Sequence, residues 1–216
     1  MMNYFNLIFS NKSILRIFQK EIFKEFKIEG DVIEFGASSE IYKNFCNSNS
    51  ENCNITYSNI DTSNEEFLNI DLQKDNSFEI RYDFAVIFNV LEHVLNPNLA
   101  IKNLSKILKK NGKIVGSTPF LFRVHGAPKD YSRFTKDHLI ELLRSCNFKD
   151  IEIIELGTGP FLACISLLRS YLKYLPIFYQ LLVLFALVFD KLIKLFIKTD
   201  PKKIYPIGYV FFATNT

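Results

Sequence analysis

The chain has 216 residues, of which 48% are hydrophobic and 23% are charged, and its formal net charge is +3. This composition excludes a disordered chain, and so small a net charge gives no support to nucleic-acid binding. Its four cysteines form no CxxC pair and have no histidine cluster beside them, so we expect neither a zinc site nor a disulfide framework. We therefore expect no bound metal and a reducing, cytoplasmic location.

The first predicted element is an amphipathic helix over residues 12–27. Apolar residues recur there at helical spacing, and basic residues form a second row four positions apart. The pattern is typical of a covering helix, and we expect residues 1–29 to form an N-terminal helical cover; a helix lying on a membrane surface is the alternative. The first residues show no basic stretch and no small-residue cleavage site, so no signal peptide is expected.

Strand-like and helix-like segments then alternate. Strands are predicted at 31–36, 54–61, 66–71, 82–90, 113–119 and 150–157. Helices are predicted at 38–46, at 96–112 and at 135–148, the last with Thr135 as its N-cap. Such alternation predicts an α/β fold, with a mostly parallel sheet and helices on both of its faces.

A long apolar segment interrupts the alternation at residues 159–198. It is predicted to form two helices that are separated near Pro176, and a final strand, YPIGYVFFAT, follows. The most apolar run, Ile177–Phe189, is shorter than the ~20 residues that span a bilayer, so packed or interfacial helices are favoured over a transmembrane span. Because no linker or repeat divides the chain, we expect a single domain over 1–216 with a hydrophobic helical insertion at 159–200.

Polar residues and glycines follow the predicted strands at the end where a parallel sheet binds ligands. Gly36 lets the backbone approach a ligand closely. Asp61 stands where an acid would accept hydrogen bonds from both ribose hydroxyls of a nucleoside, and Asp71 could accept one from an adenine amine. Ordinary roles stay open for all three: Gly36 as a turn residue, and the two aspartates as helix N-caps or turn acids.

The loop HGAPKDYSRFT, residues 125–135, places several reactive side chains between a predicted strand and a predicted helix. His125 is the candidate base, because the unperturbed pKa of histidine lies near neutrality, and Asp130 could orient it or act instead. Tyr131 could hydrogen-bond an acceptor, and Arg133 could bind its carboxylate or phosphate. The alternatives are a loop histidine with no role in catalysis and an Asp130–Arg133 pair that only pins the loop.

The order of these segments resembles class I S-adenosylmethionine-dependent methyltransferases, the type 11-like group among them. The most specific stretch is FNVLEHVLNPNLAIKNLSKILKKNGKIVGSTP, and the resemblance extends over residues 31–157 and the closing strand. It implies a Rossmann-like fold with a seven-stranded sheet whose last strand is antiparallel, and S-adenosyl-L-methionine as the cofactor. Matching positions imply cofactor contacts by Glu34, Gly36 and Ala37 at the methionine end, Asp61 on the ribose, Asp71 and Leu72 at the adenine, and Asn89 and Glu92 near the sulfonium.

The first loop, EFGASSE, departs from the family's E-x-G-x-G-x-G, with Ser38 and Glu40 at the places of later glycines. The loop at 125–135 resembles a subgroup associated with cell-surface glycan or lipid biosynthesis, which implies a glycan or lipid-linked acceptor. A small-metabolite methyltransferase and a non-catalytic relative that binds a partner or a membrane stay open. A nicotinamide-dependent dehydrogenase is disfavoured, because the first loop lacks G-x-G-x-x-G.

Membrane contact through residues 160–198 is a further expectation. Five lysines at the end of this segment or just beyond it could meet anionic headgroups: Lys191, Lys194, Lys198, Lys202 and Lys203. Helices that only cap the sheet, or that form a dimer interface, are the alternatives. The expected location is therefore the cytoplasm, with peripheral contact to the inner face of the membrane as an option, and the oligomeric state stays open.

Overall fold

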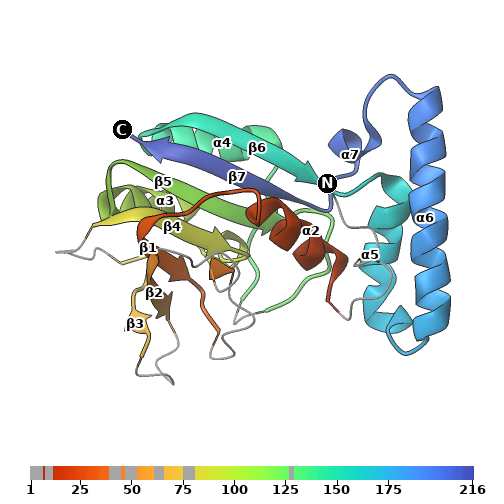
Figure 1. Cartoon of the computed structure of the whole chain (residues 1–216), viewed down its shortest axis with the longest axis horizontal. Helices are drawn as coiled ribbons and strands as arrows, with labels where there is room; N and C mark the ends of the chain where they lie inside the picture. The colour runs from red at the N-terminus through yellow and green to blue at the C-terminus, as the bar shows by residue number, and fades with distance from the viewer. Residues whose placement is uncertain are drawn as a thin grey trace. The chain divides into compact units, whose positions relative to one another are not determined.

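Seven strands form one sheet, in which the strand order is β3-β2-β1-β4-β5-β7-β6 and β7 runs antiparallel to the others (Figure 1). The strands are β1 (Gly30–Phe35), β2 (Cys53–Asn59), β3 (Leu68–Asn69), β4 (Tyr82–Phe88), β5 (Leu108–Pro119), β6 (Phe148–Leu156) and β7 (Gly208–Asn215). The computed structural model describes residues 7, 12–38, 45–46, 53–60, 66–74, 81–126 and 129–216. This topology confirms the predicted Rossmann-like α/β fold.

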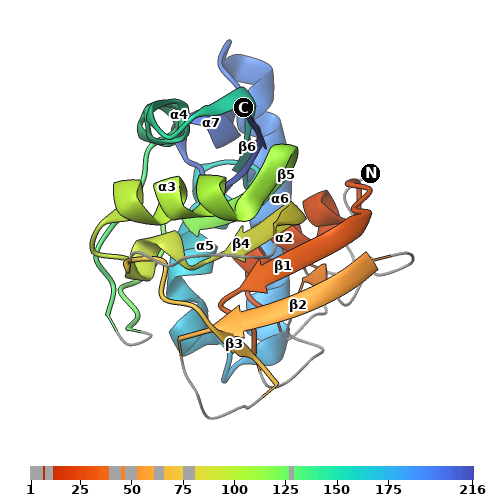
Figure 2. The same cartoon turned by 90° about the vertical axis from the view of Figure 1, so that its left-hand side faces the viewer.

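Parallel pairing aligns the carboxyl ends of three central strands. Phe35 at the end of β1 is paired with Ser58 in β2 and with Ile87 in β4. Figure 2 shows β1 and β2 side by side, with β3 next to β2 at the edge of the sheet. Because parallel strands end at the same edge, the segments that follow β1, β2 and β4 leave the sheet close to one another, as the positions of their polar residues predict.

Two helices between strands begin at side-chain caps. In α3 (Pro97–Ile107) the Asn96 side chain accepts a hydrogen bond from the Leu99 amide at 3.1 Å. In α4 (Lys136–Ser145) the Thr135 hydroxyl accepts one from the His138 amide at 3.3 Å, which confirms the predicted cap. Each helix buries a single apolar stripe, as helical spacing of its leucines and isoleucines predicts.

The end of α3 differs from the prediction. The helix was expected to continue to residue 112, but it ends at Ile107, and β5 already begins at Leu108. Leu108 has extended backbone angles and is paired with Tyr82, after which the register shifts so that Lys113 is paired with Phe84. The prediction was wrong here because Leu108 continues the helical apolar spacing, and only its pairing with β4 reveals a strand.

The chain divides into two compact units. The first comprises Met1–Phe23, Pro119–Val124 and Ile154–Tyr209, and the second comprises Lys24–Thr118, His125–Ile153 and Val210–Thr216. The predicted N-terminal helix is α2 (Ile14–Phe23), which belongs to the first unit and buries one apolar stripe. The expectation of a single domain over 1–216 stays a prediction.

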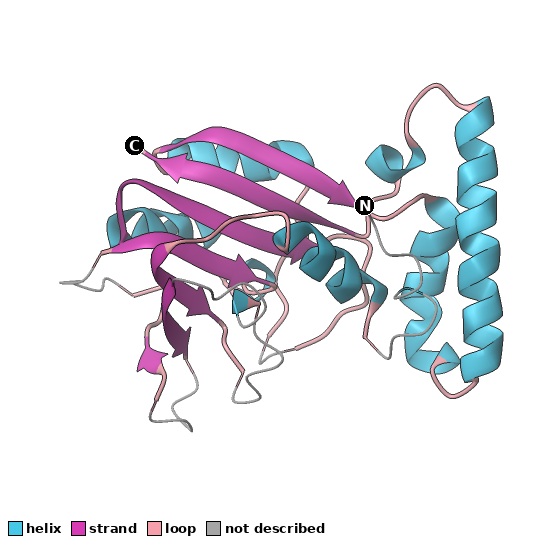
Figure 3. Cartoon of the chain, viewed as in Figure 1, coloured by secondary structure: helices cyan, strands magenta, loops and turns pink. Residues whose placement is uncertain are grey.

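A helical hairpin dominates the first unit (Figure 3). It consists of α5 (Pro160–Leu172) and α6 (Pro176–Phe196), and the short α7 (Pro201–Ile204) follows it. Pro176 is the first residue of α6, so the predicted break between the two helices is confirmed.

Asp190 explains why α6 extends beyond the predicted apolar run. Its carboxylate is buried and accepts hydrogen bonds from the Thr158 hydroxyl at 2.6 Å and from the Phe161 and Leu162 amides at 2.9 and 3.1 Å. The carboxylate thus satisfies free amides in the first turn of α5, and its charge does not interrupt α6. The helix therefore continues to Phe196, near the end of the predicted helical segment at residue 198.

Candidate functional site

A cavity of about 260 Å³ opens beyond the carboxyl ends of β1, β2 and β4. It lies within the second unit, at the position where open α/β sheets bind ligands. Its walls combine apolar and polar side chains: Phe35, Gly36, Ser58, Asn59, Ile60, Ile70, Asp71, Leu72, Gln73, Asn89, Val90, His93 and Val94.

Four of the predicted cofactor residues line this cavity: Gly36, Asp71, Leu72 and Asn89. Gly36 has a φ of 67°, and a Cβ atom there would lie 2.6 Å from a methyl group of Val90, so only glycine fits without displacement. Asn89 also has a positive φ, 56°, while its amide donates to the Ser117 carbonyl at 2.9 Å. Left-handed backbone at a residue other than glycine is costly and is often found at functional sites.

Three other predicted cofactor residues do not line the cavity, and a fourth lies outside the described residues. The Glu34 carboxylate is buried and accepts hydrogen bonds from the Phe45 and Cys46 amides at 2.7 and 2.9 Å. Ala37 is buried, and Glu92 lies behind the cavity wall, next to His93. Asp61 is the residue outside the described ranges, so its contact with the ribose stays a prediction.

The sequence analysis missed several lining residues, among them Ser58, Asn59 and Gln73. The Asn59 side chain donates to the Ala37 carbonyl at 2.7 Å and so joins the end of β2 to the segment that follows β1. Gln73 belongs to the turn that Asp71 stabilises by accepting a hydrogen bond from the Gln73 amide at 2.9 Å. The available signal was their position, since each lies two or three residues from Asp61 or Asp71 in the chain.

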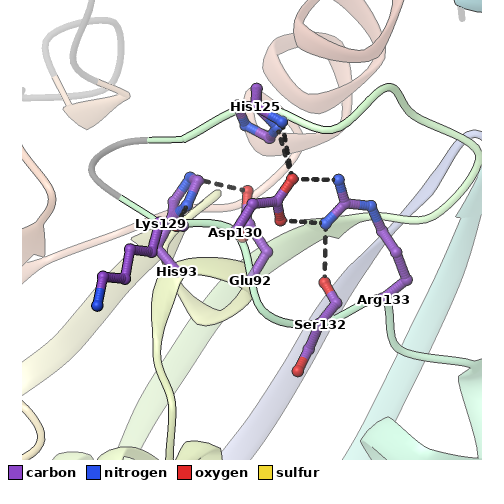
Figure 4. A network of polar contacts seen from close by, with 7 residues as sticks. All are labelled: Glu92, His93, His125, Lys129, Asp130, Ser132 and Arg133. Atoms are coloured by element: carbon purple, nitrogen blue, oxygen red, sulfur yellow. Dashed lines mark hydrogen bonds and ion pairs between the residues drawn. The ribbon is translucent and has the colours of Figure 1, made fainter.

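A polar network lies in the loop at 125–135, and Asp130 is its centre (Figure 4). The carboxylate accepts hydrogen bonds from both terminal nitrogens of Arg133, at 2.5 and 2.6 Å, and from the His125 amide at 2.8 Å. Its Oδ2 also lies 3.4 Å from Nδ1 of His125. The hydrogen bonds from Arg133 hold the pKa of Asp130 well below its usual range, so this nearly buried carboxylate is ionised at neutral pH.

The structure therefore brings His125, Asp130 and Arg133 together. Arg133 pairs with Asp130, which the sequence analysis gave as the alternative to binding an acceptor. Tyr131 lies beside them with 43% of its surface exposed. Its amide and that of Ser132 donate to the Glu92 carbonyl at 2.7 and 3.3 Å, which attaches the loop to the segment after β4.

The short helix η3 (Leu91–His93) lies beside this network and contains Glu92 and His93. Nδ1 of His93 lies 2.5 Å from the Lys129 carbonyl and must donate to it, because a carbonyl oxygen only accepts. Nε2 of His93 lies 3.8 Å from the Glu92 carboxyl group, and the rings of His93 and His125 meet edge to face at 4.9 Å between their centroids. His93 thus links the cavity, which it lines, to His125.

The family model described as a methyltransferase domain matches residues 9–153 of this chain. The chain belongs to this family. It is an S-adenosylmethionine-dependent methyltransferase, and S-adenosylmethionine is its cofactor.

Solved structures of other methyltransferases share the fold. The chain is 14% identical to an S-adenosylmethionine-dependent methyltransferase from Archaeoglobus fulgidus, with a TM-score of 0.57 and 98% of both chains covered. It is 10% identical to the N-methyltransferase NodS from Bradyrhizobium japonicum, with a TM-score of 0.54 and 95% and 89% of the two chains covered. At such identities the similarity concerns the fold.

A curated relative is similar over a shorter stretch. The uncharacterized protein MJ1123 of Methanocaldococcus jannaschii is 33% identical over 82 residues, which cover 33% of this chain and 40% of that protein. The match therefore spans less than half of the length of this relative.

The cavity of the methyltransferase fits its cofactor. Apolar side chains such as Ile60, Leu72 and Val94 offer walls for an aromatic base, and Asp71 adds a carboxylate at the same edge. Gly36 has no side chain, so the backbone that follows β1 can approach the cofactor closely. Asp71 and Leu72 would hold the adenine and Gly36 would lie at the methionine end, which are the roles that the resemblance implies.

The methyltransferase also brings together three side chains that could hold a metal ion. One ligand atom from each of Glu92, His93 and His125 lies within 4.8 Å of the other two. Two imidazoles and a carboxylate suit a divalent transition metal, provided that the carboxyl group loses its proton. The sequence analysis expected no metal site from the pattern of cysteines; Glu92 and His93 are adjacent in the chain, but His125 is distant from them and meets them through the loop at 125–135.

The buried Glu92 should make the stability of the methyltransferase depend on pH. Neither carboxyl oxygen has a hydrogen-bond partner in the described part of the chain, and burial raises the pKa of Glu92 from 4.5 to about 8. Between these values the folded state binds one proton more than the unfolded state. The free energy of unfolding should therefore fall as pH rises from 4.5 to about 8, by at most about 1.4 kcal/mol per pH unit, with no contribution from this group to the slope outside that window.

Urea unfolding at several pH values, from about pH 5 to about pH 8, measures this slope. Glu92→Gln stays neutral and should flatten it, whereas Glu152→Gln, at an exposed position on β6, should leave it as in the wild type. An equal slope in the wild type and in Glu92→Gln would show that Glu92 is ionised in the folded enzyme.

Proposed function

We propose that this enzyme methylates a hydroxyl group of a glycan or lipid-linked precursor of the cell surface, with His125 as the base. The observation that carries the proposal is the fixed His125–Asp130–Arg133 network beside His93, which lines the cofactor cavity. A hydroxyl must lose its proton when it is methylated, and a histidine held by an ionised carboxylate is suited to accept that proton.

The bound cofactor supplies a methyl group that is already activated on a sulfonium. The chain's own residues align the acceptor and remove its proton. Because Nδ1 of His125 faces Asp130, Nε2 would accept the proton that the acceptor hydroxyl loses when it is methylated. Asp130 stabilises the resulting imidazolium, and Arg133 keeps Asp130 ionised. Tyr131 is exposed enough to donate a hydrogen bond to the acceptor.

Two features support this acceptor class and location. The loop at 125–135 resembles that of methyltransferases associated with cell-surface glycan or lipid biosynthesis. All four cysteines, Cys46, Cys53, Cys146 and Cys164, are free thiols, as in reducing compartments. We place the enzyme in the cytoplasm, where precursors of surface glycans are accessible from the inner face of the membrane.

Isothermal titration with S-adenosylmethionine tests the cofactor site. Asp61→Ala should weaken the affinity by about 10-fold or more, because charge-assisted hydrogen bonds to the ribose are lost. The control is Asp137→Ala, which removes an exposed aspartate from the first turn of α4 and should bind as the wild type does. Equal affinities of wild type and Asp61→Ala would remove Asp61 from the ribose site.

The acceptor class needs a separate assay. The enzyme is incubated with methyl-labelled S-adenosylmethionine and either a lipid and lipid-linked sugar fraction or a water-soluble metabolite fraction from source cells. Label that enters the first fraction only supports the proposal. Label confined to metabolites, or to neither fraction while the cofactor still binds, overturns the acceptor class without affecting the assignment to the family.

A further inference from the structure

The outer surface of the α5–α6 hairpin is apolar over most of its circumference. In α6, the buried side chains Tyr179, Val183, Ala186 and Asp190 recur every three or four positions and form a single stripe. The remaining faces carry large exposed apolar side chains, from Ile177 (74% exposed) to Leu195 (74% exposed). An exposed apolar surface of this extent marks a site of protein or membrane contact.

The length and hydropathy of α6 suit a lipid environment. Its 21 residues correspond to about 31 Å, close to the ~30 Å of a hydrocarbon core. The helix is long and apolar enough to cross a membrane, and only 22% of its most apolar window is buried, whereas the core helix of a soluble protein is mostly buried. Length alone is weak evidence, so the choice of partner depends on where the charges lie.

Charged and amphipathic groups gather at both ends of the hairpin. Between residues 158 and 207 the chain has seven basic and two acidic side chains, and one of the acids, Asp190, is hydrogen-bonded inside the hairpin. Lys191, Lys194 and Lys198 lie at one end. At the turn, Lys173 stands between the exposed Tyr171 and Tyr174, which suits the headgroup level of a bilayer.

We propose that the α5–α6 hairpin lies in one leaflet of a membrane that contains anionic lipids, with its exposed apolar face among the acyl chains and its lysines at the headgroups. A spanning arrangement is less suitable, because α5 has only 13 residues, about 20 Å, and Lys173 at the turn would enter the hydrocarbon core. The hairpin has basic residues at its ends and apolar residues between them, and this distribution suits a segment that lies parallel to the membrane surface. The hairpin lies outside residues 9–153, which the family model matches.

Co-sedimentation with vesicles tests the surface. The enzyme is mixed with phosphatidylcholine vesicles that contain or lack phosphatidylglycerol. We expect binding that is stronger with the anionic lipid and weaker in high salt. The triple variant Leu181→Gln, Leu184→Gln and Val188→Gln changes exposed positions outside the buried stripe and should lower the bound fraction by about 10-fold or more. The matched control replaces Leu68, Leu95 and Val124, also exposed, with glutamine and should bind as the wild type does.

The orientation can be measured because the chain has no tryptophan. Single variants Phe178→Trp, Phe185→Trp and Phe196→Trp place a fluorophore along the exposed side of α6, and Leu95→Trp is the control outside the hairpin. Quenching by brominated lipids should be similar for the three hairpin positions and absent for the control. This readout needs only near-native variants, so it decides the question even if the triple variant fails to fold.

The other outcomes overturn the proposal. Quenching that differs between Phe185→Trp, near the middle of α6, and the two end positions Phe178→Trp and Phe196→Trp would show a helix that crosses the bilayer. Absence of vesicle binding, together with a dimer in sedimentation velocity that the triple variant converts to a monomer, would show that a second copy of the chain covers this face. Vesicle binding that the triple variant and the control share would place the contact elsewhere.

Discussion

Replacing His125 with alanine should slow methyl transfer by about 10²-fold or more and leave the affinity for S-adenosylmethionine unchanged. Nδ1 of the imidazole lies 3.4 Å from the Asp130 carboxylate and the ring meets His93 edge to face, but His125 itself is not among the residues that line the cofactor cavity. The substitution therefore removes the proton acceptor and not a wall of the cofactor site. Turnover is measured with labelled cofactor on the accepting fraction, and affinity by titration.

His138→Ala is the matched control, because His138 lies on the exposed side of α4 and should be replaceable without loss of turnover. Asp130→Asn gives an independent test, since it keeps the shape of the side chain but removes the charge that faces His125. We expect a loss of turnover in this variant too, with the affinity for the cofactor maintained. Wild-type turnover in His125→Ala would exclude His125 as the base.

Replacing Gly36 with valine should weaken cofactor binding by about 10²-fold or more. The position has a φ of 67°, which costs a residue with a Cβ atom about 1–2 kcal/mol, and the new atoms would meet Val90 at 2.6 Å. Because both residues line the cavity, relief of this clash must move Val90 or the loop after β1. Titration with S-adenosylmethionine measures the loss.

Gly30→Val controls for backbone strain. Gly30 has a φ of 80° at the opposite end of β1, and a Cβ atom there would meet the Asp83 carboxylate at 2.5 Å, away from the cavity. Both variants should lose stability in urea, but only Gly36→Val should lose affinity. An equal loss of affinity in the two variants would trace the effect to the strand and not to the cavity.

Patterns of local sequence were enough to predict the sheet and part of the site. The apolar runs that became β1 and β4 were visible as strands, and Gly36 and Asn89 were found because they follow those strands directly. The cavity lies where the ends of parallel strands meet, so position along the chain was a sufficient guide for such residues.

Residues whose role depends on a distant partner could not be predicted in this way. Glu34 was expected at the cofactor, but its carboxylate accepts hydrogen bonds from the amides of Phe45 and Cys46, and sequence pattern does not reveal this contact. The proximity of Glu92 and His93 to His125 likewise follows from the path of the loop at 125–135. Helical spacing is also silent about hydrogen bonds, so the sequence did not reveal that Asp190 is buried against the start of α5.

Two of the hydrogen bonds that join the loop at 125–135 to the turn after β4 are made by backbone atoms alone, beside the bond from the His93 side chain to the Lys129 carbonyl. The amides of residues 131 and 132 donate to the carbonyl of Glu92, next to the cavity-lining His93, and no side chain takes part in these two bonds. Any residue except proline supplies the same donors. The side chains at these two positions are thus free to diversify under selection for new acceptors, while the loop stays anchored beside the site of methyl transfer. Within this one peptide segment, the side chains can change during evolution while the backbone amides keep the loop in place.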